Sequence, residues 1–364
     1  MEAPLTVCRG KTLEYLGMKI DYSDKGKVMF LMREYVKNLL KECPDELLKA
    51  GTATTPVANH ISNINPNDAK LGNKKAEIFH HLVAKLLYLS KRTRPDIQFP
   101  VAFLTTRLRK PDIDDWKKLG RCLRHLKGSM ELDLTLETTL PMIIHWWIDS
   151  AYGVHPDCKS HTGGAMSLGK GCPINMSRKQ RINTRGSTEA ELVGVNDNMT
   201  MVLWVKLFLE AQGIKVVDNI IYQDNKSTML LEKNGRQSSG KKTCHFEIQY
   251  YFIHDHIKRG NVRVEYCPTD LMVGNFHTKP LQGSAFRRYR ALILNLPHDA
   301  VLDPMTDSQE CVGTSSKPSV RAPVSSYEFE VSKPLDQDWI MVKPKPSKRK
   351  ASKKDHFFVE PSNV

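Results

Sequence analysis

The chain has 364 residues, enough for two or three domains, and carries 54 Lys and Arg against 40 Asp and Glu, a formal charge of +14. This charge favours a polyanionic partner, nucleic acid before any other. Eight cysteines without a C-x-x-C pair argue against a zinc ribbon or a disulfide scaffold, and the absence of a long apolar run or signal-peptide core argues against a membrane; a cytoplasmic or nuclear protein is therefore expected.

The first 140 residues are predicted to form a short hairpin followed by helices. The hairpin pairs residues 13–21 with residues 27–32 across the polar turn DYSDKGK. Apolar residues at helical spacing then predict helices at Arg33–Lys41, Ile78–Leu89, Val101–Leu108 and from Pro111 through Leu126. This region is therefore expected to be mainly helical.

The last of these helices has a basic face, and further basic residues precede Pro95. Together they form the predicted nucleic-acid contacts, which are Lys91, Arg92, Arg94, Lys117, Arg121, Arg124 and Lys127. A solvated helix face explains such a stripe about half the time. The positive charge of the whole chain favours phosphate contact over that interpretation.

Residues 141–297 have a different pattern, in which strands and helices alternate. The expected elements are strands at Ile143–Ile148, Gly163–Leu168 and Ile174–Arg178, a helix at Thr188–Gln212, a strand at Asn219–Gln223, helices at Asn225–Asn234 and Phe246–Arg259, a strand at Asn261–Tyr266, and a helix from about Asp270. This order predicts the α/β class in the broad sense, an α+β arrangement with a mixed sheet and helices packed on it.

Residues 298–364 are rich in Ser, Pro and charge and show no periodicity, so disorder is expected there. The basic run Lys343–Lys354 within this tail suits nuclear import, nucleic-acid binding or simple solubility. Three regions are therefore predicted, with boundaries near residues 140 and 297.

Three acidic residues stand where predicted elements begin or end. Asp149 and Asp224 each follow an apolar, β-prone run, and Glu191 lies on a helix in the segment STEAEL. Carboxylates at strand ends project from the edge of a sheet. Hard oxygen ligands without nearby Cys or His favour Mg²⁺ or Mn²⁺ over zinc. The sequence therefore predicts a metal site made of these three residues.

Each acid also has a simpler interpretation. Thr188 and Glu191 fit a helix capping box, Glu189 competes with Glu191 for the metal, and Asp224 could cap the helix that follows it. Separately, four residues have the spacing of zinc ligands, namely His155, Cys158, His161 and Cys172. A Gly-rich hairpin explains that segment without zinc, so the metal-site prediction is kept for the three acids.

Several segments resemble a known family. WWIDSAYGVHPDCKSHTGGAMSLGKG, NTRGSTEAELVGV, YQDNKSTMLLEKNG and YCPTDLMVGNFHTKPLQG resemble the ribonuclease H domain of copia-type LTR retrotransposon polyproteins. Upstream, YLGMKI and FHHLVAKLLYLSKRTRPDIQFPVAFLTTRL resemble the end of the reverse transcriptase and its connection segment. The likeness extends from about residue 13 to residue 296.

The resemblance implies a ribonuclease H-like fold for residues 141–297, preceded by a thumb or connection region. It implies an endonuclease that cuts the RNA strand of RNA–DNA hybrids with two Mg²⁺ or Mn²⁺ ions. Asp149, Glu191 and Asp224 match three of the family's four catalytic acids, and Asn275 stands at the fourth, which removes one negative charge and weakens cation binding. Other departures, at Cys158, Gly186 and Gln249, are typical of a decaying copy.

The polymerase Asp-Asp pair of this family has no counterpart before Leu13, so no polymerase activity is expected from this chain alone. The resemblance leaves room for a separate reverse transcriptase chain as a partner. Two alternatives to a nuclease stay open: a non-catalytic nucleic-acid-binding remnant of the polyprotein, and a fragment whose exposed surfaces lack their polymerase neighbour.

Overall fold

The computed structural model describes residues 9–235 and 247–297, with the backbone alone described for residues 247–250. All of the described residues fall in one compact unit. The expected tail at residues 298–364 and its basic run lie outside the described residues. The predicted domain boundary near residue 140 stays a prediction.

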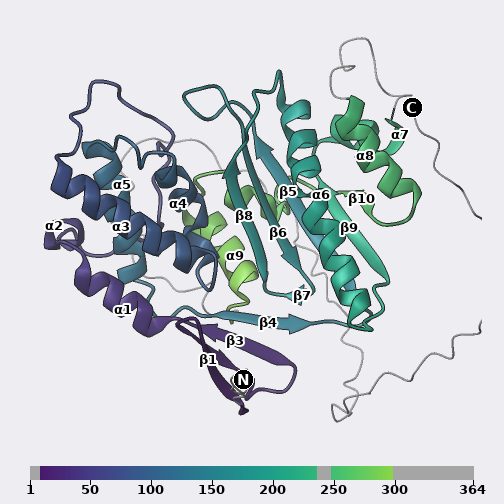
Figure 1. Ribbon diagram of the computed structural model, residues 1–364, viewed down its shortest axis with the longest axis horizontal. Helices are drawn as coiled ribbons and strands as arrows, with labels where there is room; N and C mark the ends of the chain where they lie inside the picture. Colours follow the sequence, from purple (N-terminus) through teal and green to yellow (C-terminus); the bar gives the residue numbers. More distant parts are fainter. Residues whose placement is uncertain (1–8, 236–246, 298–364) are drawn as a thin grey trace, which may run out of the picture. The chain divides into compact units, whose positions relative to one another are not determined.

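The chain up to residue 138 is a set of short strands and helices (Figure 1). Its elements are β1 (Thr12–Tyr15), β2 (Met18–Asp21), β3 (Lys27–Leu31), α1 (Arg33–Glu42), α2 (Asp45–Leu48), α3 (Asn73–Ser90), η1 (Pro95–Ile97), α4 (Gln98–Thr105), α5 (Ile113–Lys127) and β4 (Leu134–Thr138). Helices α1, α3, α4 and α5 confirm the predicted helical segments. Their apolar faces share one core, centred on Phe79, Leu86 and Leu123.

One predicted strand is divided in the structure. Residues 13–21 were expected to be continuous, but β1 ends at Tyr15 and β2 begins at Met18. Leu16 and Gly17 between them have φ values of 50° and 71°, so the backbone enters the left-handed region and reverses direction. The predicted hairpin therefore consists of β2 and β3, with β1 as an additional antiparallel strand.

The first sheet has the order β1-β2-β3-β4-β7, and all of its pairs are antiparallel. Strand β4 was not predicted, and it pairs with β3 more than 100 residues earlier, as in Lys27↔Glu137. Strand β7 (Gly169–Lys170) lies in the predicted hairpin turn and pairs with β4. At Gly169 a Cβ atom would lie 2.6 Å from the Glu137 carbonyl oxygen, so the close approach of β4 requires glycine there.

The second sheet is mixed and has the order β10-β9-β5-β6-β8. Its region comprises β5 (Ile143–Ala151), β6 (His161–Ser167), β8 (Ile174–Lys179), α6 (Ser187–Ala211), β9 (Asp218–Gln223), α7 (Lys226–Asn234), α8 (Glu247–Lys258), β10 (Arg263–Tyr266), η4 (Val273–His277) and α9 (Gly283–Leu294). Strands β5, β6 and β8 are antiparallel, whereas β5–β9 and β9–β10 are parallel. This arrangement confirms the predicted α+β class and mixed sheet.

The helix expected from about Asp270 differs from the observed structure. Residues 273–277 form the short 3-10 helix η4, and α9 begins only at Gly283. Pro280 lies between the two and cannot continue a helix that precedes it, because it lacks a backbone N–H. The interruption matters because it places residues 275–279 beside the second sheet.

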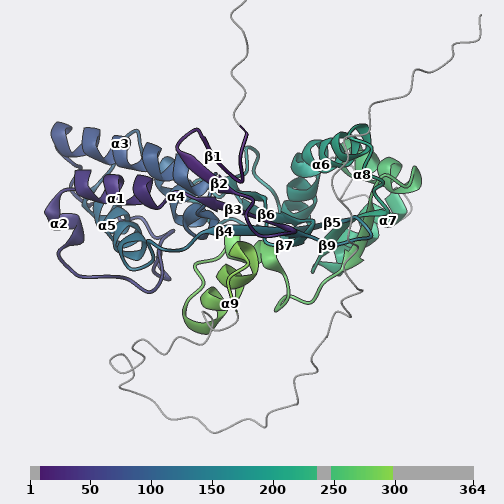
Figure 2. The ribbon, with the colours of Figure 1, turned by 90° about the horizontal axis from the view of Figure 1, so that it is seen from below.

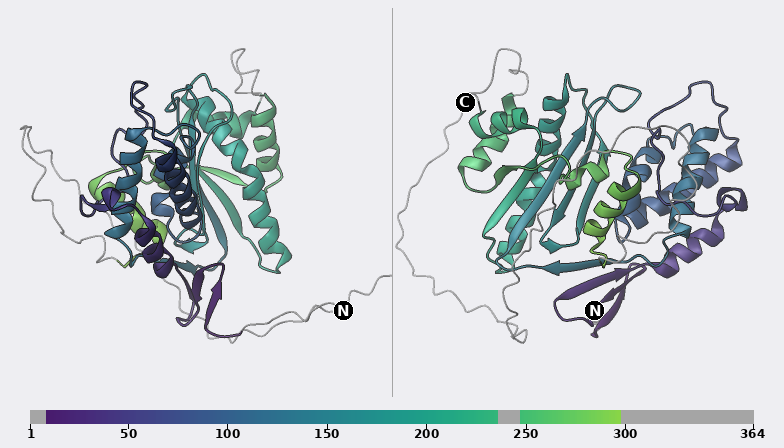
Figure 3. Two further views of the ribbon diagram at one scale, coloured as in Figure 1. Left: turned by 60° about the vertical axis from the view of Figure 1, so that its left-hand side comes forward. Right: turned by 180° about the vertical axis from the view of Figure 1, so that it is seen from behind.

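The two faces of the second sheet are covered by different helices. Alternate residues of β5, including Ile144 and Trp146, pack in the core that contains Val195 of α6. Trp147 points to the opposite face and packs near Phe276 and its neighbours. Figures 2 and 3 show α6 and α9 on opposite sides of the strands. The sheet is therefore a middle layer.

Helix α6 is long and apolar enough to meet the length and hydropathy test for a membrane span, with a mean hydropathy of 1.2, although the sequence led us to expect no such segment. Half of the 18-residue apolar stretch of α6 that gives this value is buried within the fold. Val195, Met199 and Val202 pack against the sheet in a shared core. Burial against the sheet therefore accounts for its apolar character.

Candidate metal centre

Three carboxylates from distant parts of the chain meet near the C-terminal ends of β5 and β9, two neighbouring interior strands of the second sheet. Strands β5 and β9 are parallel, with Trp147 opposite Tyr222. Asp149 and Asp224 each lie two positions beyond this pair, so the strand register places them side by side. Glu191 reaches them from α6, and one ligand oxygen of each residue lies within 4.8 Å of the others. The predicted trio is thus brought together.

The centre is electrostatically unfavourable without a cation. Asp149 and Glu191 are buried, with exposed fractions of 2% and 5%, and Asp224 is half-buried. Burial raises the pKa of Asp149. Burial, followed by the nearby charges of Asp149 and Asp224, raises the pKa of Glu191 well above its ordinary value. The Oε2 atom of Glu191 is buried and has no hydrogen-bond partner. An oxygen-binding cation would relieve both the repulsion and the missing contact.

Two glycines allow the surrounding elements to approach Asp149. Gly194 lies on α6 one turn after Glu191, and a Cβ atom there would clash with Ser150 Oγ. A Cβ atom at Gly274 would lie 2.9 Å from the Cβ atom of Asp149. The close packing of α6 and η4 on β5 therefore depends on these two positions, which the sequence analysis did not single out.

Thr278 and Lys279 also border the centre and were missed as site residues. The Thr278 hydroxyl donates a hydrogen bond to Asp149 Oδ2. The Nζ atom of Lys279 lies 3.8 Å from the same oxygen. Both residues belong to the HTKP segment, which contributed to the family resemblance. That motif could therefore have identified them as site residues. They hold Asp149 in place and partly offset its charge.

Asn275, the predicted fourth member, contacts the centre indirectly. Its side chain is buried, and Nδ2 donates to the Thr269 carbonyl at 2.7 Å. Its Oδ1 atom accepts a hydrogen bond from Lys279. These two partners fix the amide orientation, because one is an acceptor and the other a donor. Asn275 is thereby linked to Asp149 through Lys279.

The alternative helix-capping interpretations do not hold. Helix α6 has Gly186 at its N-cap position without a side-chain capping bond, while Glu189 accepts from the Arg185 backbone N–H at 2.8 Å. Asn225 caps α7 by accepting from Ser227 and Thr228. Glu191 and Asp224 are therefore available to the carboxylate cluster.

The candidate zinc ligands do not converge in the structure. His155 Nε2 and His161 Nδ1 are 3.0 Å apart, but Cys158 is exposed and Cys172 packs in the core beneath α9. Across the part of the chain that the structure describes, the three acids form the group of His, Cys, Asp or Glu ligands close enough to share a metal. The zinc alternative therefore has no support.

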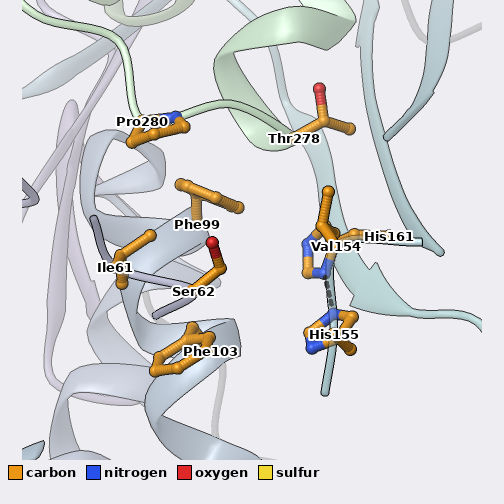
Figure 4. Close-up of a pocket in the computed structure, with 9 residues that line it drawn as sticks. All are labelled: Ile61, Ser62, Phe99, Phe103, Val154, His155, His161, Thr278 and Pro280. Atoms are coloured by element: carbon orange, nitrogen blue, oxygen red, sulfur yellow. Dashed lines mark hydrogen bonds between the residues drawn. The ribbon is translucent and has the colours of Figure 1, made fainter. Parts of the chain in front are cut away.

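The histidines instead form a buried hydrogen-bonded chain. His161 Nε2 lies 2.8 Å from Ser177 Oγ, which donates to the His277 carbonyl. Burial lowers the pKa of His155 to about 4 and the pKa values of His161 and His277 to about 3. Figure 4 shows His155 and His161 facing Phe99 and Phe103 of α4 across a small cavity. These hydrogen-bonded histidines lie where α4 meets the second sheet.

The predicted basic residues do not form one uniform surface. Lys117 and Lys127 on α5 are exposed, as are Lys91 and Arg92. Arg92 lies over the Tyr88 ring at 5.2 Å. These four side chains are accessible to a polyanion.

Arg121 and Arg124 have a second role. The Arg121 guanidinium donates to the hydroxyl and carbonyl of Thr55, and Arg124 donates to the Leu47 carbonyl. Both are half-buried, so Arg121 ties the loop at Thr55 to α5 and Arg124 ties α2 to α5, in addition to the charge that they supply.

Arg94 was wrongly expected at this surface. It has an exposed fraction of 1%, and it forms a two-point ion pair with Asp96 at 2.7–2.8 Å. It also donates to the carbonyl and hydroxyl of Ser129. A guanidinium needs such partners to be buried, so Arg94 stabilises the helical region and cannot reach a phosphate.

The fold and the site define an α+β protein in which three carboxylates converge, two from neighbouring strands of a mixed sheet and one from a helix. No protein-family model matches the chain. It is 24% identical over 289 residues to the retrovirus-related Pol polyprotein from transposon TNT 1-94 of Nicotiana tabacum, a match that covers 78% of the chain and 22% of the relative. It is 30% identical over 264 residues to the corresponding polyprotein from transposon RE1 of Arabidopsis thaliana, covering 72% of the chain and 18% of the relative.

The polyprotein from transposon RE2 of Arabidopsis thaliana is 29% identical over 259 residues, which is 71% of the chain and 17% of the relative. The chain belongs to the retrovirus-related Pol polyproteins of copia-type transposons, and this confirms the family resemblance of its motifs. It spans about a fifth of the length of these relatives.

Proposed function

We propose that the chain is a retrotransposon-derived ribonuclease H that cuts the RNA strand of RNA–DNA hybrids with divalent metal ions. The observation that carries this proposal is the convergence of Asp149, Glu191 and Asp224 within 4.8 Å. The donor set consists of carboxylate oxygens, which suits Mg²⁺ or Mn²⁺. The buried, unpartnered Oε2 atom of Glu191 is consistent with a cation ligand.

The strand arrangement supports a ribonuclease H-like fold. The sequence pattern predicts three antiparallel strands, a long helix and a further strand, with acids at two strand ends and on the helix. The second sheet has this organisation, with Asp149 on β5, Glu191 on α6 and Asp224 after β9. Sheet order and acid positions therefore both support the proposal.

Each residue of the centre has a distinct role in this proposal. Asp149 would hold both ions, and Glu191 and Asp224 would complete the ligand set. When bound, the two ions activate a water molecule and stabilise the leaving 3′-oxygen of a phosphodiester. Thr278 orients Asp149 by donating to its Oδ2 atom. Lys279, which is half-exposed and lies 3.8 Å from Asp149 Oδ2, would be placed to contact a phosphate oxygen of a bound strand.

Hybrid recognition would rest on shape and charge. Proteins recognise A-form geometry and 2′-hydroxyl groups across the minor groove, without reading base edges. The exposed Lys91, Arg92, Lys117 and Lys127 would supply phosphate contacts. A separate reverse transcriptase chain is a further proposed partner, and work in the cytoplasm or nucleus fits a nucleic-acid substrate.

A second candidate function is nucleic-acid binding without catalysis. The observation that favours it is the neutral Asn275, whose Oδ1 accepts from Lys279 where the family has a fourth acid. One carboxylate fewer, together with an ammonium group 3.8 Å from Asp149, opposes cation binding.

Substrate choice distinguishes the two candidates. The full chain would be incubated with an end-labelled RNA–DNA hybrid, the same RNA alone, and the same RNA as an RNA duplex, each in Mg²⁺, Mn²⁺ or chelator. The nuclease proposal expects cuts in the RNA of the hybrid with metal, and none in the other two substrates. Hybrid binding without any cut in either metal would establish the second candidate and overturn the first.

A further inference from the structure

Helix α6 covers the second sheet with one side and exposes an apolar stripe on the other. Four large apolar side chains on that outer side have exposed fractions between 41% and 62%, namely Met201, Trp204, Leu207 and Phe208. The rings of Trp204 and Phe208 stack, with their centroids 5.0 Å apart. Spacings of three and four residues place all four on one helix face, away from Val202 and Val205 in the core. Such an outer stripe on a folded protein indicates a contact surface.

The outer stripe is almost free of charge. Between Thr200 and Ala211 the exposed residues of α6 include one charged side chain, Glu210, whose carboxylate lies 3.6 Å from Lys206 Nζ. A polyanion needs positive side chains at its binding site, and the stripe offers none that is exposed. A nucleic acid is therefore a poor occupant, and an apolar protein surface is the matching one.

Opposite charges flank the two ends of the outer stripe. Asp197 lies seven residues before Trp204, and Lys215 lies seven residues after Phe208. Both flanking side chains are exposed, and neither forms an ion pair with any described residue. Two stripes that meet antiparallel bring each Asp197 toward a Lys215 and also oppose the two helix dipoles. A parallel meeting would bring like charges together, so the charges favour the antiparallel one.

We propose that the outer stripe is the contact between two copies of this chain, which pair antiparallel about a two-fold axis. In this pairing Trp204 of each copy lies opposite Phe208 of the other. Aromatic side chains bury about 150–250 Å² each when fully covered, so four partly exposed side chains contribute on the order of 400 Å² per copy. Stable dimers bury about 800 Å² per partner. The stripe therefore supports a weak, reversible dimer.

The pairing leaves the three acids accessible. Glu191 is on the same helix, ten residues before Met201, which is about 15 Å along the helix axis. Its side chain is buried beside Asp149 on the inner side of α6, whereas the outer stripe is exposed. A dimer of this kind therefore carries two separate centres. Its formation requires neither metal nor cleavage and so goes beyond the proposed nuclease activity.

Sedimentation equilibrium of the full chain measures the association directly. Chelator would be present, with about 0.15 M salt so that a Debye length of about 8 Å limits repulsion between two chains of charge +14. The weight-average mass should rise with concentration from one chain toward two. Leu207→Glu buries two unpaired carboxylates in the pairing and should weaken the association at least about tenfold.

Leu230→Glu is the matched control for this variant. Leu230 lies on α7, outside the stripe, and is 56% exposed, against 62% for Leu207. The same change of residue type at this position should leave the association as strong as in the wild-type chain. Circular dichroism of both variants checks that each is folded.

Charge reversal tests the antiparallel orientation. Asp197→Lys and Lys215→Asp should each weaken the association, because each places like charges at both ends of the contact. The double variant restores opposite charges and should recover most of the affinity. Both positions are exposed, so these variants test the contact even if Leu207→Glu fails to fold.

Four results would overturn the proposal. A mass of one chain at every concentration would mean that no dimer forms, and unchanged affinity in Leu207→Glu would place the contact elsewhere. No recovery in the double charge variant would exclude the antiparallel pairing. Binding of the monomer to phosphatidylcholine vesicles that Leu207→Glu removes would mark the stripe as a membrane contact. Because chelator is present throughout, these outcomes are independent of whether the chain cleaves hybrids.

Discussion

Lys279 places its Nζ atom 3.8 Å from Asp149 Oδ2 and donates a hydrogen bond to Asn275. The ammonium group therefore lies between the first acid of the cluster and the position where the family carries a fourth acid. A lysine at this point supplies positive charge to the cluster, as a metal would. Cation affinity should depend on how strongly position 275 draws Lys279 away from Asp149.

Asn275→Asp should raise the affinity for Mg²⁺. The new carboxylate adds a negative charge beside the cluster and pairs with Lys279, which leaves Asp149 more available to a cation. A Mg²⁺ titration of hybrid cleavage should shift toward lower metal concentration, and the gain should shrink at saturating metal. Coincident curves for two active proteins would mean that position 275 does not influence the metals.

Glu191→Gln should stabilise the metal-free protein near neutral pH. Burial and two acidic neighbours raise the pKa of Glu191, so its ionisation opposes folding once the pH exceeds the ordinary glutamate range. Removing this charge should increase the free energy of unfolding by on the order of 1–3 kcal/mol. Urea unfolding in chelator checks this value. A loss of stability in chelator would contradict the electrostatic description of the centre.

Glu191→Gln has a second readout, which is the change in melting temperature on adding Mg²⁺. Mg²⁺ should raise the melting temperature of the wild-type chain, because a ligand that binds only the folded state stabilises it. Glu191→Gln should show a much smaller shift. Glu189→Gln is the matched control, since Glu189 lies on the same turn but accepts a backbone N–H of Arg185 outside the cluster.

Acid should destabilise the fold through its buried histidines. The pKa values of His161 and His277 are lowered to about 3, so below pH 6.5 the unfolded chain binds more protons than the folded chain. The contribution of these neutral histidines to the free energy of unfolding is complete above pH 6.5. It falls as the pH drops, by about 1.4 kcal/mol per pH unit for each histidine. Urea unfolding between pH 7 and 4 measures the slope. His161→Asn should make it shallower by one proton, and an unchanged slope would exclude His161 as a contributor.

Arg94→Ala should unfold or strongly destabilise the helical region. Its guanidinium pairs with the buried Asp96, and removing one partner of a buried ion pair costs about 3–5 kcal/mol. Lys127→Ala, which removes an exposed charge, should change stability by less than about 0.5 kcal/mol. A stable Arg94→Ala protein with weakened nucleic-acid binding would restore the original prediction of a phosphate contact.

Periodicity predicted the second sheet well. The apolar runs before Asp149 and Asp224 lie in strands β5 and β9, and their parallel register brings the two acids together. The first strand is longer than predicted, because β5 continues through Asp149 to Ala151. The choice of Glu191 over Glu189 also agrees with the geometry, because the helix turns Glu191 toward the sheet. Local pattern sufficed here because both strands are buried, although Asp149 lies within β5, two residues before its end, while Asp224 directly follows β9.

Features that depend on distant contacts could not be predicted in this way. Strand β4 is defined by pairing with β3 more than 100 residues earlier, and β7 exists only because β4 lies beside it. Arg94 looks like surface charge until Asp96 and Ser129 surround it. Lys279 gains its importance from Asp149, 130 residues earlier in the chain. Topology decides each of these, and local composition carries little information about it.

The most direct test of the central claim is the rate of RNA cleavage in a hybrid for the wild-type chain and for Asp149→Asn at saturating Mg²⁺. Asparagine keeps nearly the same volume and removes the carboxylate at the centre of the cluster. We expect metal-dependent cleavage by the wild-type chain and none by the variant, with unchanged hybrid binding and circular dichroism. Cleavage at equal rates in the two proteins would show that the three acids are not the catalytic centre.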